Sequence, residues 1–143
     1  MGQDLRFFIR INDDFVSVVS YSRNQTMFSV FSEVPYERVR ALEAGDFNHA
    51  IEKVDDKLVF YKKEIDRISN LIKAISEFPN PIEEKIRSID KCNREREEIR
   101  FAYEEALQIQ CILEMFKNIL KNGVRLYFGY EIDAPTVNDI LPT

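Results

Sequence analysis

The stretch FNHAIEKVDDKLVFYKKEIDRISNLIKAI, residues 47–75, carries apolar side chains at alternating spacings of four and three residues. The residues on this pattern are Phe47, Ile51, Val54, Leu58, Tyr61, Ile65, Ile68, Ile72 and Ile75. A 3.5-residue repeat keeps one apolar stripe facing the same partner helix, which is typical of a coiled-coil seam. The sequence therefore predicts one long helix whose seam packs against a second helix.

Boundary signals around Pro79-Asn80-Pro81 predict that the second helix is the next segment of the same chain. Proline disfavours helical geometry in the residue before it, and it is tolerated in the first turn of a helix that an asparagine caps. We expect the first helix to begin at the cap residue Asp46 and the second to end at Asn122-Gly123, because glycine permits a left-handed stop. The two segments predict an antiparallel helical hairpin over residues 46–122.

The seam of the second helix is expected to be less regular than that of the first. Its good seam positions are Ile82, Ile86 and Ile89, after which the polar run 93–98 interrupts the pattern until Ile99. Folding the hairpin about its turn places Ile72 near Ile86, Ile65 near Cys92, Tyr61 near Arg96 and Val54 near Tyr103. A polar residue such as Arg96 within a seam can set the register of the two helices.

Alternating apolar residues outside the hairpin predict a small sheet. The expected strands are Leu5–Ile11, Phe15–Tyr21, Thr26–Val34 and Val124–Tyr130, with a tight turn at Asn12-Asp13. A short helix is expected over Tyr36–Ala44, ended by Gly45, and the tail after residue 132 looks irregular. The fold class is therefore α+β: an antiparallel sheet of three N-terminal strands and one C-terminal strand, with a long antiparallel helical hairpin. One domain of residues 1–143 contains the parts 1–45, 46–122 and 123–143.

The net charge of the chain argues against one class of partner, nucleic acids in general. The chain of 143 residues has a net charge of −5, which argues against general nucleic-acid binding, because that needs a surplus of basic residues. No run of apolar residues is long enough for a transmembrane helix, and no signal peptide is expected. Cys92 and Cys111 lie too far apart on one helix to form a disulfide, so we expect a reducing cytoplasm, that of the host cell if the protein is viral.

The residues that carry most enzyme chemistry are scarce. The single His49 lies at a helix start, and the two cysteines are distant, so we expect no metal site and no cofactor. None of the four glycines belongs to a phosphate-binding loop, and the adjacent acidic pairs lie on exposed helix faces or in a turn. We therefore expect a non-enzymatic protein without catalytic residues.

A basic and aromatic patch at the junction of sheet and helices is the first candidate binding surface. Arginine and tyrosine are enriched in interface hot spots, and arginine also binds carboxylate and phosphate groups. The candidate residues are Tyr36, Arg38, Arg40, Arg6, Arg10, Tyr127 and Tyr130. The hairpin tip, Phe78–Ile82, is the alternative working surface.

Several large apolar residues lie off the seams of both helices. They are Phe60, Leu71, Phe78, Phe101 and Leu107. Exposing so many would be unusual for a monomer, so these residues predict an oligomer interface in which two hairpins form a four-helix bundle.

The order of elements resembles small uncharacterised accessory proteins of bacteriophages, especially phages of Gram-positive hosts. The segments that carry the resemblance are residues 8–13, Val34-Pro35-Tyr36, the heptads of 51–75 and residues 126–130. It implies a phage-encoded, non-enzymatic protein of the host cytoplasm that binds and inhibits a host protein such as a defence factor. Two alternatives stay open: a sponge that sequesters a small anionic nucleotide signal, and a structural or assembly protein of the virion.

Overall fold

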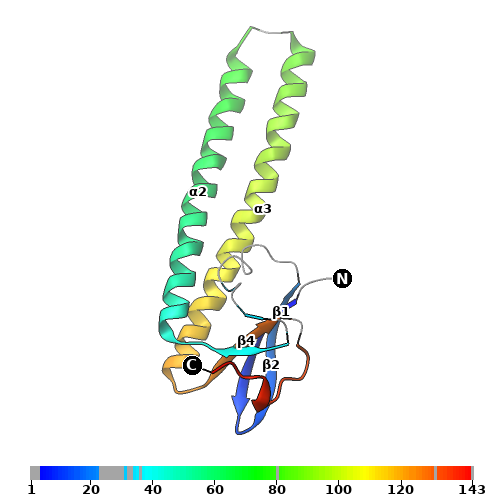
Figure 1. Cartoon of the computed structure of the whole chain (residues 1–143). Coiled ribbons are helices and arrows are strands. Elements are labelled where there is room, and N and C mark those ends of the chain that lie inside the picture. The colour runs from blue at the N-terminus through cyan, green and yellow to red at the C-terminus, as the bar shows by residue number, and fades with distance from the viewer. Residues whose placement is uncertain are drawn as a thin grey trace. The chain divides into compact units, whose positions relative to one another are not determined.

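The computed structural model describes residues 4–22, 31, 34–35, 37–79, 81–130 and 132–142. Two compact units are present in it. One consists of Met1–Val54 and Ile109–Thr143, and the other of Asp55–Gln108. The first unit holds the sheet together with the adjoining ends of two long helices, and the second holds the remainder of those helices (Figure 1).

The sheet has four antiparallel strands: β1 (Asp4–Ile11), β2 (Asp14–Ser22), β3 (Val39–Ala41) and β4 (Leu126–Tyr130). Their order is β2-β1-β4-β3, so the C-terminal strand lies between two N-terminal strands. The expected turn between β1 and β2 forms, and Asn12 takes the left-handed conformation (φ 57°) that asparagine tolerates. The predicted fold class, with three N-terminal strands, one C-terminal strand and two long helices, is confirmed.

The third N-terminal strand differs from the prediction. Most of the expected strand Thr26–Val34 lies outside the described residues. The short helix expected over Tyr36–Ala44 is wrong, since β3 lies within that segment and pairs with β4. Glu37 has a φ of 61°, which a right-handed helix excludes, and Val39 is fully buried in the strand pairing. Pairing with β4 therefore outweighs the helical pattern of this segment.

The two faces of the sheet have separate apolar clusters. On one face Phe7 of β1 lies 5.1 Å from Phe116 between ring centroids, and Phe116 lies 6.3 Å from Phe47. The sheet thus covers part of the apolar C-terminal region of the second long helix on this face. On the other face Phe8, Val39, Tyr127 and Ile132 form a buried cluster, against which Phe15, Ala41 and Ile140 pack.

The C-terminal tail is more ordered than its sequence indicates. It contains the short 3-10 helix η1 (Val137–Asp139), and Ile140 forms a parallel bridge with Val39 of β3. The Leu141 N–H donates to the Val39 carbonyl over 2.8 Å. The expectation of an irregular tail is therefore wrong for residues 137–140.

Gly129 of β4 is packed so closely that we expect a side chain there to be harmful. A Cβ would lie 2.5 Å from the Arg38 carbonyl oxygen and 3.0 Å from side-chain atoms of Val39 and Ile132. We expect Gly129→Ala to lower the free energy of unfolding by up to about 3 kcal/mol, because backbone must move to admit the methyl group. Urea unfolding measures this change, and a loss below about 0.5 kcal/mol would contradict the close approach of β3.

The helices are α2 (Ala44–Glu77) and α3 (Ile82–Lys121). α2 begins two residues before the expected cap, so Gly45 lies in its first turn and does not end a helix. Asp46 instead reaches back as the third helical residue, and its Oδ2 accepts the Glu43 N–H over 2.8 Å, as in a capping box. The end of α2 before Pro79 and the end of α3 before Asn122 agree with the prediction.

Between residues 55 and 108 the two helices run antiparallel as a hairpin (Figure 1). Every expected seam residue of α2 is buried or half-buried there, as predicted. On α3 the expected seam positions Ile82 and Ile86 are exposed, which makes that part of the prediction wrong. The covered side chains of α3 include Lys85, Ile89, Cys92, Arg96, Ile99, Tyr103 and Ala106.

Arg96 lies in the seam, as expected, but it does not face Tyr61. Its Nη1 donates to Ser69 Oγ over 3.1 Å and its Nη2 to Asn93 Oδ1 over 2.9 Å. Side chains of a helix lean toward its N-terminus, which for α3 lies at the hairpin turn. The guanidinium therefore reaches a serine about two helical turns nearer the turn than Tyr61.

Candidate functional site

The residues of the predicted basic and aromatic patch do not share one surface. Cross-strand pairing places Arg6 opposite Gly129 and Phe8 opposite Tyr127, on the face that the C-terminal tail covers. Arg40 and Tyr130 belong to the other face, which packs on the helices. Tyr36 lies outside the described residues.

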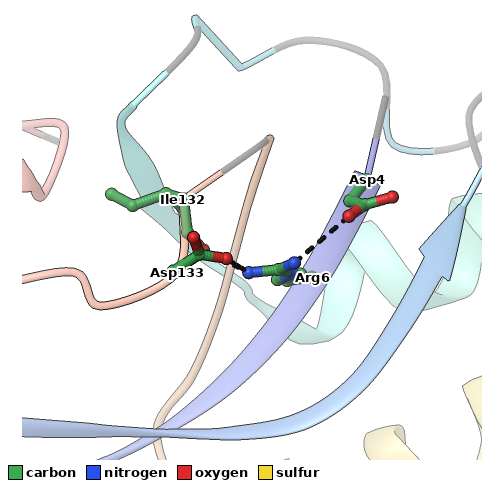
Figure 2. A network of polar contacts seen from close by, with 4 residues as sticks. All are labelled: Asp4, Arg6, Ile132 and Asp133. Carbon is green, nitrogen blue, oxygen red and sulfur yellow. Dashed lines mark hydrogen bonds and ion pairs between the residues drawn. The ribbon is translucent and has the colours of Figure 1, made fainter. Parts of the chain in front are cut away.

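Arg6 is held by acidic and carbonyl groups on two sides (Figure 2). Its Nη2 bonds Asp4 Oδ2 on the same strand over 3.1 Å, and its Nη1 forms an ion pair with Asp133 of the tail. Nη1 also lies 3.5 Å from the Ile132 carbonyl oxygen. Arg6 thus ties the tail to β1.

Arg10 is directed at the β1–β2 turn and at Tyr127. Its Nε donates to the Asn12 carbonyl over 2.7 Å, and its Nη1 lies 3.3 Å from the Tyr127 hydroxyl. The hydrogen bond with Tyr127, supported by Asp13, raises the pKa of Arg10 above its ordinary value. The Tyr127 ring is buried, so only its hydroxyl end meets the arginine.

Arg38 binds the backbone of the tail. Its Nε donates to the Asp139 carbonyl over 3.0 Å and its Nη2 to the Ile140 carbonyl over 3.3 Å. Both acceptors lie beside the bridge between Ile140 and Val39. This arginine therefore stabilises the docked tail.

Arg40 and Tyr130 make contacts within the chain on the sheet face that packs on the helices. The Arg40 guanidinium lies 4.8 Å from the centre of the Phe128 ring and bonds Asp46 of α2 over 3.1 Å. The Tyr130 hydroxyl donates to the Phe31 carbonyl over 3.2 Å in a buried position. The arginine and tyrosine side chains of this patch that the structure describes thus bind groups of the same chain.

A different surface stands out at the turn of the hairpin, where α2 ends and α3 begins. Phe78 is 61% exposed, Ile82 74% and Ile86 55%. We call these three residues the tip cluster. Isolated apolar residues are normal on a surface, but three large ones around a single turn form a candidate contact site.

Sequence reasoning named the tip Phe78–Ile82 as an alternative surface, but it also assigned Ile82 and Ile86 to the seam and so missed the exposure of Ile86. The covered residues Ala106, Cys92 and Lys85 show the actual repeat. Continuing the spacing of three and four from Ala106 back through Cys92 leads to Lys85 and not to Ile86. This repeat in the sequence could have shown that Ile86 lies off the seam.

Groups with metal-binding or nucleophilic chemistry are dispersed. Within the described residues no three His, Cys, Asp or Glu side chains come together as a metal site would require. His49 is exposed in an early turn of α2. An open groove near the exposed Cys111 is lined by α3 residues, among them Glu114, Met115 and Asn118.

Neither α2 nor α3 contains an apolar stretch that meets the requirements of a membrane-crossing helix, over the residues that the structure describes. Comparison of the chain with protein-family models, with curated proteins and with solved structures found no match.

Proposed function

We propose that the chain is a non-enzymatic binding protein that contacts another protein through the tip cluster. The observation that carries this proposal is the exposure of Phe78, Ile82 and Ile86 around one turn of the hairpin. From the resemblance to phage accessory proteins we further propose that it is phage-encoded and that its partner is a host defence protein, which it inhibits.

The chemistry of the tip cluster suits an apolar pocket on a folded partner. Large apolar and aromatic side chains that enter such pockets supply most of the energy of an interface. Pro79 and Pro81 flank the turn, and proline reduces the conformational freedom that binding would otherwise remove. A short, stiff and apolar turn is therefore a suitable anchor.

The contacts of the arginines weigh against the nucleotide sponge. A phosphate site needs guanidinium groups whose donors are available to the ligand. Arg6, Arg10, Arg38 and Arg40 each donate to groups of their own chain. A nucleotide would have to displace these contacts, and with Arg6 and Arg38 it would release the tail.

The test begins with capture from a bacterial lysate, followed by identification and purification of the captured protein. We expect Ile82→Ser/Ile86→Ser to weaken binding of the purified partner by about 30-fold or more, since losing hot-spot residues typically costs about 2 kcal/mol. Phe101→Ser is the matched control, because Phe101 is also exposed on α3 but lies away from the tip. Isothermal titration calorimetry measures both affinities.

Equal affinities of the two variants would contradict the tip as the contact surface. The identity of the partner separates the remaining alternatives. A host protein supports the inhibitor, whereas a protein of the virion would indicate an assembly role. A captured nucleotide with no protein would indicate the sponge.

A further inference from the structure

A second apolar surface runs along α2 within residues 55–108. Phe60 and Leu71 are 59% and 42% exposed. Their separation of 11 residues brings the two side chains to within about 20° of the same direction around the helix. We call this set the α2 stripe. It lies beside the seam and does not face α3.

The seam itself is incompletely covered in the same region. Leu58, Tyr61, Ile65, Ile72 and Ile75 are only half-buried, and Ile68 is the one large apolar side chain buried completely among the described residues 55–108. Two helices form a single layer, and a single layer leaves the apolar seam open on both sides. A second layer across the seam would bury both the seam and the α2 stripe.

The size of this surface is sufficient for a stable dimer. Within residues 55–108 α2 is about 35 Å long and α3 about 40 Å, and each helix is about 10 Å wide, so one face of the hairpin measures about 750 Å². Two such faces would bury about 1,500 Å² in total, which lies within the usual range for a specific interface.

The charges of the hairpin also permit contact between copies. Residues 55–108 contain 11 basic and 13 acidic residues, so two copies repel each other only weakly. The charged residues spaced between Phe60 and Leu71 on the α2 stripe, Glu64 and Arg67, already form an ion pair over 2.9 Å. The hydrogen bond from Arg67 lowers the pKa of Glu64, which keeps this pair charged to lower pH.

We propose that a second copy of this chain covers the α2 stripe and the open seam, and that the two hairpins form a four-helix bundle. Phe60 and Leu71 of each copy are the contact residues, and Phe78, which follows the end of α2, is left to the tip cluster. Phe101 is left out of this contact, because it lies midway between the seam residues Ile99 and Tyr103 and therefore on the far side of α3. The role of Leu107 in an oligomer interface stays a prediction. The dimer goes beyond the proposed function and does not depend on a host partner.

The test is the mass in solution of the purified full chain, measured by light scattering at about 100 μM. We expect about 34 kDa, twice the 16.9 kDa of one chain. Phe60→Glu/Leu71→Glu should give 16.9 kDa, because it places charge on the covered face. Val59→Glu is the matched control, because Val59 is 55% exposed next to Phe60 but points about 100° away, and it should keep the larger mass.

A wild-type mass of one chain would overturn the dimer, as would an oligomer that Phe60→Glu/Leu71→Glu leaves intact. Circular dichroism checks that the double variant remains helical. Should it unfold, Phe60→Gln replaces it, since glutamine favours a helix and carries no charge. That variant should shift the midpoint of dissociation to at least about tenfold higher concentration, and an unchanged midpoint would contradict the proposal.

Discussion

Phe116→Ala is expected to lower the free energy of unfolding by about 3–5 kcal/mol, the usual cost of removing a fully buried aromatic ring. Phe116 is 0% exposed, and its ring meets Phe7 of the sheet and Phe47 of α2. The substitution therefore leaves a cavity where α2, α3 and β1 meet. Urea denaturation followed by circular dichroism measures the loss.

Met115→Ala is the matched control for this substitution. Met115 precedes Phe116 on the same helix but is 50% exposed, so its truncation should change stability by no more than about 0.5 kcal/mol. A similar effect of the two substitutions would show that the aromatic contacts of Phe116 do not hold the helices to the sheet.

Ile68→Ala is expected to cost about 2–5 kcal/mol, because Ile68 is fully buried at the centre of the hairpin seam. Leu58→Ala removes a side chain of the same size from a half-buried seam position, so its cost should be smaller. Thermal unfolding ranks the two variants. Both need the same protein concentration, since self-association adds a concentration-dependent contribution. A larger loss for Leu58→Ala would contradict the packing of the seam.

The parts of the fold that could be predicted are those whose pattern repeats. The seam of α2 spans four heptads, and every one of its residues is covered in the structure. β1 and β4 alternate over several residues, which is sufficient to assign a strand and to place its faces. Pro79 and Gly123 mark helix ends because they limit or extend the backbone conformations available.

The parts that could not be predicted depend on contacts between distant residues. β3 has only three residues, too few for any periodicity, and its pairing requires Gly129, about ninety residues further along the chain. The seam of α3 contains Lys85 and Arg96. These polar residues interrupt the apolar heptad pattern by which a seam is recognised in a sequence. Ile82 and Ile86 look like core residues by composition and are exposed instead.

The candidate site could be predicted only in part, for a related reason. Arginine and tyrosine bind external ligands and internal carbonyls with the same donors, so residue type cannot separate the two uses. Arg38 illustrates this use, since its guanidinium donates hydrogen bonds to two backbone carbonyls of the tail. Phe78, by contrast, was identified from its position off the seam and is exposed in the single chain, while its predicted role in an interface stays a prediction.

The docked tail also has a consequence for how the protein avoids misassembly. Without the docked tail, the outer edge of β3 would expose unpaired backbone N–H and C=O groups. An extended segment of another chain can pair with such an edge, which is a common starting point of aggregation. Ile140 and Leu141 occupy part of this edge, and Arg38 fastens them there. Residues 140 and 141 therefore protect part of the β3 edge, and they leave fewer backbone groups there for another chain to pair with.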